Sequence, residues 1–261
     1  SVGSAVAATA TLTVIADVVP PAFDRAASTW IDITPTTPIT GTAAAVTGIT
    51  AGGTGGLTIP TAAAGAEIQR TADGLLYSGS KYSAITTTPP ISGGVILIAE
   101  LRLTQGSDTG TAIDLGPNLY ARQGGANLQY GYNFGAAAIV TAGPAVAGSW
   151  AVMAIELDRD AGTIRYWDGD EIITVTGIDA SSFAPTQVRL GQSFLGAIRN
   201  ASVATKTAGG AWTATLEQLL EAYGAGGAGV VPAGPAATRL RILPALIQSE
   251  ARPDAGTMPA M

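Results

Sequence analysis

Three carboxylate residues alternate with other side chains in the stretch Glu156-Leu157-Asp158-Arg159-Asp160. Alternate side chains of a β-strand point to the same face, so this spacing would place the carboxylates side by side. Adjacent carboxylates can serve as nucleophile and acid in the cleavage of a glycosidic bond. Ala161-Gly162 follows directly, however, and predicts that residues 158–162 form a solvated hairpin turn. An acid in such a turn gains neither the geometry nor the raised pKa that cleavage needs, so we predict no catalytic residues and no enzyme.

Aspartates could instead bind calcium, because carboxylate oxygens are the hard ligands that this ion prefers. Asp158 and Asp160 are the candidate metal ligands, and Asp168, Asp170 and Asp179 offer further oxygens. Aspartate is also common in Asx turns, where its side chain accepts hydrogen bonds from the backbone. The turn interpretation is favoured, so the sequence requires no cofactor and leaves Ca²⁺ as an alternative.

Aromatic residues suggest a second kind of site, because ring faces bind the apolar faces of sugars while polar neighbours orient the hydroxyl groups. Tyr130, Tyr132 and Trp167 are the candidate ligand-binding residues, and the two tyrosines share one face of a predicted strand. Aromatic residues also fill the cores of sandwiches, and we expect a core position for Trp150 and Phe194. A carbohydrate platform and a core position therefore both remain open for the three candidates.

The 261 residues include no histidine and no cysteine. This excludes Ser-His-Asp and Cys-His catalysis, His-ligated zinc and disulfide bonds. The formal net charge is −6, and Lys81 and Lys206 are the only lysines among 13 basic residues, so we expect no nucleic-acid partner. Charged residues make up only 12% of the chain, which predicts a weakly solvated surface that copies of the chain or other partners cover.

The apolar run from Val2 to Val19 is interrupted by threonines and by Asp17, and no positive charge precedes it. It is therefore neither a signal peptide with a basic start nor a membrane span of about 20 apolar residues. We expect no membrane partner. If Ser1 follows a removed initiator methionine, we expect synthesis without a cleaved export signal.

From Asp73 onward, short apolar runs recur at a spacing of roughly 8–12 residues, separated by turn-forming residues, as is typical of an antiparallel β-sandwich. Asp168-Gly169 predicts a tight type I′ turn that pairs strands 163–167 and 170–176. One short helix is predicted over 215–223, because apolar residues fall at i, i+3, i+4 and i+7 from Leu216, with a threonine cap before them and Gly224 after them.

The composition predicts three regions. Residues 1–64 are rich in Thr, Gly and Pro and are expected to form an extended N-terminal arm. Residues 65–224 are expected to form the sandwich. Residues 225–261 are expected to form a C-terminal linker, a strand at 238–243 and a tail.

Four motifs of the predicted sandwich recur together in one known family: Gly148-Ser149-Trp150-Ala151-Val152, Ile164-Arg165-Tyr166-Trp167-Asp168-Gly169, Leu190-Gly191 and Phe194-Leu195-Gly196-Ala197-Ile198. With them, residues 65–224 resemble a concanavalin A-like jelly roll of the laminin-G or pentraxin type. The resemblance implies an all-β, lectin-like sandwich, with calcium at a loop rim in many members. Laminarinase-like glycoside hydrolases share this class and carry Glu-x-Asp-x-Glu on one strand, where this chain ends the pattern with Asp160.

These observations favour a non-enzymatic structural or adhesion protein of a bacteriophage particle, such as a head decoration, head fibre or tail-associated protein. We expect it in the virion, as a homo-oligomer whose partners are copies of itself and other virion proteins. The first alternative is a carbohydrate-binding module for cell-surface glycans. The second is a glycoside hydrolase that uses Glu156 and Asp158.

Overall fold

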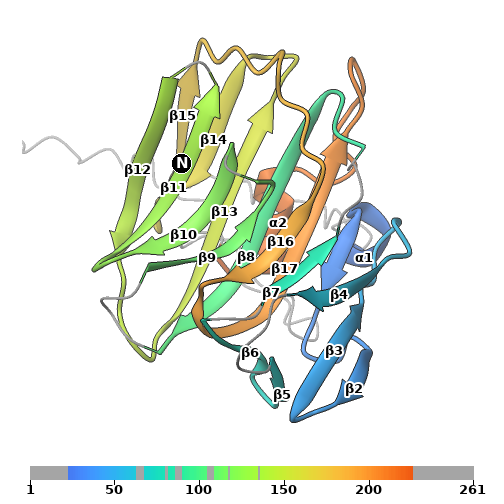
Figure 1. The fold of residues 1–261 in the computed structure, drawn as a ribbon. Helices are drawn as coiled ribbons and strands as arrows, with labels where there is room; N and C mark the ends of the chain where they lie inside the picture. The colour runs from blue at the N-terminus through green and yellow to red at the C-terminus, as the bar shows by residue number, and fades with distance from the viewer. Residues whose placement is uncertain are drawn as a thin grey trace, which may run out of the picture. The chain divides into compact units, whose positions relative to one another are not determined.

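The computed structural model of the chain describes residues 23–62, 68–79, 82–85, 90–104, 109–116, 118–134 and 136–225. The chain divides into two units, Ser1–Val230 and Val231–Met261, and every described residue lies in the first. The strand predicted at 238–243 and the leader before residue 23 lie outside the described residues. The described strands form two antiparallel sheets (Figure 1).

The first sheet, called sheet I, contains eight strands. They are β1 (Ile31–Ile33), β5 (Gln69–Thr71), β6 (Gly74–Ser78), β8 (Gly94–Leu103), β13 (Trp150–Asp158), β14 (Thr163–Trp167), β15 (Ile172–Thr176) and β17 (Leu195–Lys206). Their order is β15-β14-β13-β8-β17-β6-β5, and β1 pairs with β17. The long strands β8, β13 and β17 therefore lie at the centre.

The second sheet, called sheet II, contains nine strands. They are β2 (Ile39–Thr42), β3 (Ala45–Thr50), β4 (Thr58–Ala62), β7 (Tyr82–Ile85), β9 (Thr109–Asp114), β10 (Leu119–Gly124), β11 (Asn127–Phe134), β12 (Ala136–Pro144) and β16 (Val188–Gln192). Their order is β12-β11-β10-β9-β16-β7-β4-β3-β2, so β12 forms one edge and β2 the other. The predicted antiparallel β-sandwich is confirmed.

In strand β8, alternate side chains point to opposite faces of sheet I, so the strand contributes to two hydrophobic clusters. Val95 and Leu97 belong to the core that also contains buried side chains of sheet II, while Ile96 and Ile98 belong to a second cluster on the other face of sheet I. That second cluster is covered by helix α2 (Leu216–Ala222). All four side chains are fully buried, and each such burial stabilises the fold by about 1.5–3 kcal/mol. The described part of the chain therefore has three layers: sheet II, sheet I and α2.

Helix α2 confirms the predicted short helix and its cap. Thr215 and Gln218 form a capping box, in which each side chain accepts a hydrogen bond from the backbone N–H of the other residue. Helix α1 (Arg25–Ser28) is a single additional turn. None of the described helices has both the length and the apolar character needed to cross a membrane.

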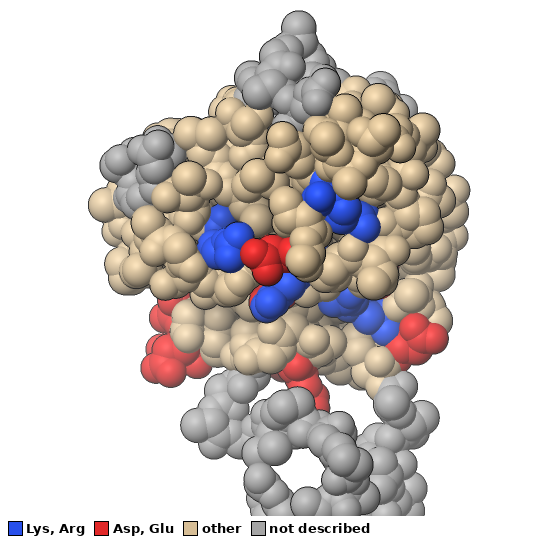
Figure 2. All heavy atoms as spheres, turned by 90° about the horizontal axis from the view of Figure 1, so that it is seen from below, with Lys and Arg blue, Asp and Glu red and all other residues tan. Residues whose placement is uncertain are grey.

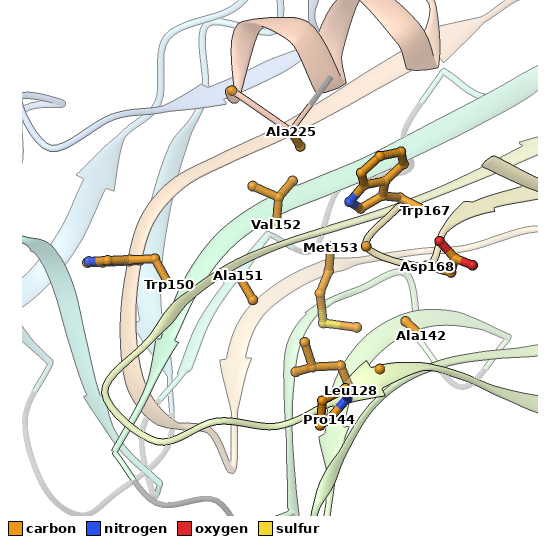
Figure 3. Close-up of a pocket in the computed structure, with 13 residues that line it drawn as sticks. Leu128, Ala142, Pro144, Trp150, Ala151, Val152, Met153, Trp167, Asp168 and Ala225 are labelled. Carbon is orange, nitrogen blue, oxygen red and sulfur yellow. The ribbon is translucent and has the colours of Figure 1, made fainter. Parts of the chain in front are cut away.

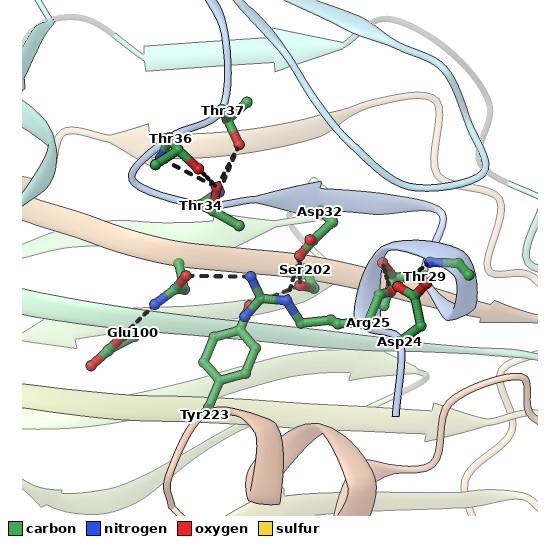
Figure 4. A network of polar contacts seen from close by, with 12 residues as sticks. Asp24, Arg25, Thr29, Asp32, Thr34, Thr36, Thr37, Glu100, Ser202 and Tyr223 are labelled. Carbon is green, nitrogen blue, oxygen red and sulfur yellow. Dashed lines mark hydrogen bonds and ion pairs between the residues drawn. The ribbon is translucent and has the colours of Figure 1, made fainter. Parts of the chain in front are cut away.

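A buried polar network joins α1, β1, β17 and the end of α2 (Figure 4). Arg25 Nε lies 2.7 Å from Asp32 Oδ1, which also accepts a hydrogen bond of 2.8 Å from the Ser202 hydroxyl. Ser202 in turn lies 2.8 Å from the Tyr223 hydroxyl. Because these groups are satisfied by one another, residues that are nearly 200 positions apart in the sequence are held on one face of sheet I.

Residues 31–62 belong to the region that we predicted to be an extended arm. In the structure they contribute four strands to the two sheets. Ile31 of β1 lies opposite Val203, and Thr61 of β4 lies opposite Ser83. Ile31 and Ile59 are buried in the main core. The apolar residues that make these contacts are interspersed with Thr, Gly and Pro, which hid the strand pattern in the composition. The expected boundary at residue 64 therefore does not coincide with a break in the sheets.

The predicted hairpin between β14 and β15 is confirmed, but its turn is longer than expected. Trp167 lies opposite Ile172, so four residues form the loop where the sequence predicted a two-residue turn. The Asp168 side chain accepts hydrogen bonds from the backbone N–H groups of Asp170 and Glu171, and this Asx turn shapes the loop. Gly169 has a φ of +107°, as only glycine adopts readily.

We expect Gly169→Val to lower the free energy of unfolding by about 1–2 kcal/mol, because a β-branched residue is strained at this φ. The added side chain itself has room, since the nearest atom to a Cβ at this position is 3.9 Å away. Urea unfolding followed by circular dichroism measures the change. Asp170→Val, at an exposed position of the same loop, is the control; equal losses in the two variants would contradict the backbone explanation.

Candidate binding site

Glu156 of the acidic stretch lies on the outer face of sheet I, where it is only 2% exposed. It lies opposite Arg165 of β14, with 3.3 Å between Glu156 Oε1 and Arg165 Nη1, and Arg165 also binds Glu217 of α2. Burial raises the pKa of Glu156 to about 7, although Arg165 opposes this change. The carboxylate therefore belongs to an ion-pair cluster between the sheet and the helix.

Asp158 and Asp160, the candidate metal ligands, converge on a lysine. Lys206 Nζ lies 2.8 Å from Asp158 Oδ2 and 3.1 Å from Asp160 Oδ2. Asp158 Oδ1 accepts hydrogen bonds of 3.0 Å from the backbone N–H groups of Asp160 and Ala161, which confirms the predicted turn. A calcium ion at this pair would have to displace the ammonium group. Within the described residues, no group of three or more acidic side chains is placed to hold a metal.

Of the two positions left open for Tyr130 and Tyr132, the structure shows the core position and not the carbohydrate platform. Tyr130 is fully buried and Tyr132 is 9% exposed, and both belong to the core cluster between the sheets. The Tyr130 ring lies 5.4 Å from the ring of Tyr166, and the Tyr132 ring lies 6.4 Å from that of Phe134. Their faces are covered by protein, so neither offers a stacking surface to a sugar.

Tyr130 nevertheless helps to shape a pocket. Its hydroxyl donates a hydrogen bond of 2.7 Å to the carbonyl of Trp167 and accepts one of 2.9 Å from the N–H of Ala154. The backbone pairing of β13 with β14 ends at Ile155 and Tyr166. The Tyr130 hydroxyl therefore bridges the next two residues along these strands, Ala154 and Trp167. Burial raises the pKa of Tyr130, which keeps this donor protonated. Beyond this bridge the two strands no longer pair.

A pocket of about 490 Å³ lies where the strands separate (Figure 3). Its walls come from β11, β12, β13, the end of β14 with the following loop, and the residues after α2. Trp167 and Asp168 lie on one side, and Leu128 and Pro144 lie on another. Of the three predicted ligand-binding residues, only Trp167 lines this pocket. The remaining walls come from distant segments, so no local sequence signal could have identified them together.

Asp168 supplies the charged group of the pocket. Its Oδ1 atom accepts hydrogen bonds of 2.9 Å and 2.8 Å from the backbone N–H groups of Asp170 and Glu171. These backbone hydrogen bonds lower the pKa of Asp168, so the group is ionised at neutral pH. Both of these hydrogen bonds are made to Oδ1 rather than to Oδ2. The pocket thus combines apolar side chains with an ionised carboxylate that can accept hydrogen bonds.

Trp150, predicted to be a core residue, is half-buried at the rim of the pocket, whereas Phe194 is fully buried as expected. The ring of Trp150 points away from the other lining side chains (Figure 3). The guanidinium carbon of Arg199 lies 4.4 Å from its ring centre and that of Arg102 lies 5.2 Å away. These cation–π contacts occupy the indole, which explains why it does not enter the core.

Both arginines beside Trp150 are also paired with acids. Arg199 binds Glu100, and Arg102 Nη2 lies 2.8 Å from Asp73 Oδ2. The face shown in Figure 2 is mostly uncharged, with a few separate basic and acidic groups. The rim of the pocket therefore presents no unpaired cation among these residues.

No family model and no curated protein matches this sequence. Among solved structures, the fold is similar to the botulinum neurotoxin serotype D binding domain, with 10% identity over 76% of this chain and 51% of that chain, at a TM-score of 0.51. The receptor binding domain of botulinum neurotoxin mosaic serotype C/D matches at 9% identity over 69% and 48%, with a TM-score of 0.49. The binding domain of botulinum neurotoxin DC, solved in complex with rat synaptotagmin II, matches at 12% identity over 67% and 48%, with a TM-score of 0.45. This chain spans about half the length of these structures, and the similarity is one of β-sandwich fold.

Proposed function

We propose that the protein is a non-enzymatic binding protein that holds a neutral carbohydrate in the pocket between β12, β13 and the β14–β15 loop. The observation that carries the proposal is the pocket itself. Its volume of about 490 Å³ lies in the range of ligand sites, and its lining combines apolar side chains with polar atoms, among them the Asp168 carboxylate. The serotype D domain, which shares the fold, is itself a binding domain, which supports this use of the sandwich.

The chemistry of the walls favours an uncharged sugar. Pro144 is exposed and can contact the apolar face of a pyranose ring, while Leu128 and Trp167, each 8% exposed, contribute only the floor of the pocket. The Asp168 carboxylate can accept hydrogen bonds from the hydroxyl groups of the sugar. Asp168 is the only ionisable side chain among the lining residues of the described chain. A sialic acid or sulfate group would meet this carboxylate without a free cation to offset the repulsion. Neutral glycans are therefore the expected ligands.

The proposal excludes catalysis by the acidic stretch for a physical reason. Glu156 is buried and paired with Arg165, while Asp158 and Asp160 are paired with Lys206. None of the three lines the pocket. We therefore expect the protein to bind its glycan without releasing a cleaved product.

We expect Asp168→Asn to weaken binding of neutral oligosaccharides by about 10–100-fold, because it removes a charged hydrogen-bond acceptor from the pocket. The amide oxygen can still accept the two backbone hydrogen bonds of the turn, so the loop is retained. An array of neutral, sialylated and sulfated oligosaccharides identifies the ligand, and titration calorimetry measures its affinity.

Asp170→Asn is the matched control, because it removes the same charge two residues away from a side chain that does not line the pocket. Its affinity is expected to equal that of the unaltered protein. Equal losses in both variants would point to a general charge effect, and no binding to any neutral glycan would contradict the proposal.

We propose in addition that the protein works as part of a bacteriophage particle. The small share of charged residues, 12%, supports this setting, because a particle component buries much of its surface against other subunits. Antibodies raised against the protein are expected to label purified particles in electron micrographs. Labelling confined to particle-free fractions would contradict this part of the proposal.

A further inference from the structure

Strand β12 differs from every other strand that ends a sheet in the described structure. The edge strands β2 and β5 and the short strand β1 have three or four residues each, and β2 also carries a bulge at Gly41. Strand β15 has five residues and follows the acidic residues Asp170 and Glu171. Short length, bulges and charges are the usual protection of sheet edges against pairing. Strand β12 has nine residues, Ala136–Pro144, and no charge among them.

The middle of β12 also exposes an apolar side chain. Ile139 is 54% exposed, and it and Val146 are the exposed large hydrophobic residues among those described. On the opposite face of the strand, Ala138 and Val140 pack against the core, so the strand is held in register with β11. Among the described strands, β12 pairs with β11 alone, which leaves its outer backbone groups without a strand partner.

We propose that β12 pairs with β12 of a second copy of this chain, antiparallel and around a two-fold axis at Ile139. In this register Ile139 lies opposite its own copy, with about 5 Å between the two Cβ atoms, so each side chain covers the other. Ala138 then lies opposite Val140, which continues the apolar face that packs on the core. The pairing joins two sheets II into one continuous sheet.

Charge distribution permits a second copy as the occupant, whose fit comes from the self-complementary register around Ile139. The acidic β14–β15 loop lies beside the far end of β12, since a Cβ on Gly143 would lie 3.7 Å from the carbonyl of Asp168. Gly143 is four residues from the axis, so the two loops are separated by eight residue steps, roughly 27 Å. This distance is several times the Debye length of about 8 Å at physiological salt, so their repulsion is screened. The strand itself brings no charge into the contact.

Sedimentation equilibrium of the full chain tests the proposal. One pair of edge strands buries less surface than a standard interface, so we expect a weak dimer. The measurement therefore covers protein concentrations up to about 1 mM. The unaltered protein is expected to form a dimer within this range. Ile139→Lys is expected to raise its dissociation constant at least about tenfold, because like charges directly opposite each other destabilise a strand pair. Absence of dimer in the unaltered protein would overturn the proposal.

Val146→Lys is the matched control, since Val146 is also 54% exposed but lies beyond the end of β12. It is expected to dimerise like the unaltered protein. Equal amounts of the Ile139→Lys and Ile139→Glu variants are expected to form a mixed dimer, because the register places opposite charges face to face. A dimer that survives Ile139→Lys, or a mixture of the two variants that stays monomeric, would overturn the pairing. Circular dichroism checks that each variant is folded.

Discussion

Arg189→Met is expected to lower the free energy of unfolding by about 3–5 kcal/mol, because it leaves a buried carboxylate without its counter-charge. Asp114 is 1% exposed, and its Oδ1 atom lies 2.8 Å from Arg189 Nε on the neighbouring strand. Burial raises the pKa of Asp114, and the ion pair and hydrogen bond with Arg189 work against this rise. Chemical unfolding at pH 7, followed by circular dichroism, measures the loss.

Two further variants separate this effect from a general cost of losing an arginine. Arg122→Met removes a guanidinium that binds the neutral side chain of Gln129 on a partly exposed face, and we expect a cost below about 1 kcal/mol. The double variant Asp114→Asn/Arg189→Met is expected to recover much of the stability, because no charge then remains buried. A double variant as unstable as Arg189→Met alone would contradict the ion-pair explanation.

Glu156→Gln is expected to change how stability depends on pH. The pKa of Glu156 is about 7 in the folded protein and 4.5 as its ordinary value. The folded state therefore binds a proton more tightly, and this contribution is complete below pH 4.5 and is lost as the pH rises through 7. The shift corresponds to about 3 kcal/mol. Relative to Glu156→Gln, the unaltered protein should thus lose about 3 kcal/mol of stability between pH 4.5 and pH 8.

Unfolding curves at several pH values for both proteins give this difference, in which the other titrating groups largely cancel. Glu221→Gln, an exposed position on α2, is the control and should keep a constant difference from the unaltered protein. A constant difference for Glu156→Gln as well would show that Glu156 is not held in a desolvated position.

The elements predicted best are those whose signal is local. The alternation around Ile164 and the Asx-type loop at Asp168 depend on a few neighbouring residues, and so does the capping box at Thr215. These interactions form within one hairpin or one helical turn, so the sequence alone specifies them. The predicted length of the hairpin loop was wrong, because an aspartate such as Asp168 can close a four-residue loop with its side chain as well as begin a tight turn.

The site was harder to predict because it depends on long-range contacts. Tyr130 was identified for its ring, yet its hydroxyl matters more, since it bridges Ala154 and Trp167 where two strands separate. Trp150 was assigned to the core from its type, whereas two arginines that are distant in the sequence hold it at the rim. Neither contact has a signature in the residues next to it, so the pocket could not be derived before the sheets were placed.

The layer formed by α2 has a practical consequence for experiments. The helix covers one face of sheet I, and Glu221 is one of its exposed residues. A fluorophore or affinity tag attached at Glu221 would therefore lie on the opposite side of sheet I from sheet II. Immobilisation through this residue should hold the described strands with the outer surface of sheet II directed away from the sensor.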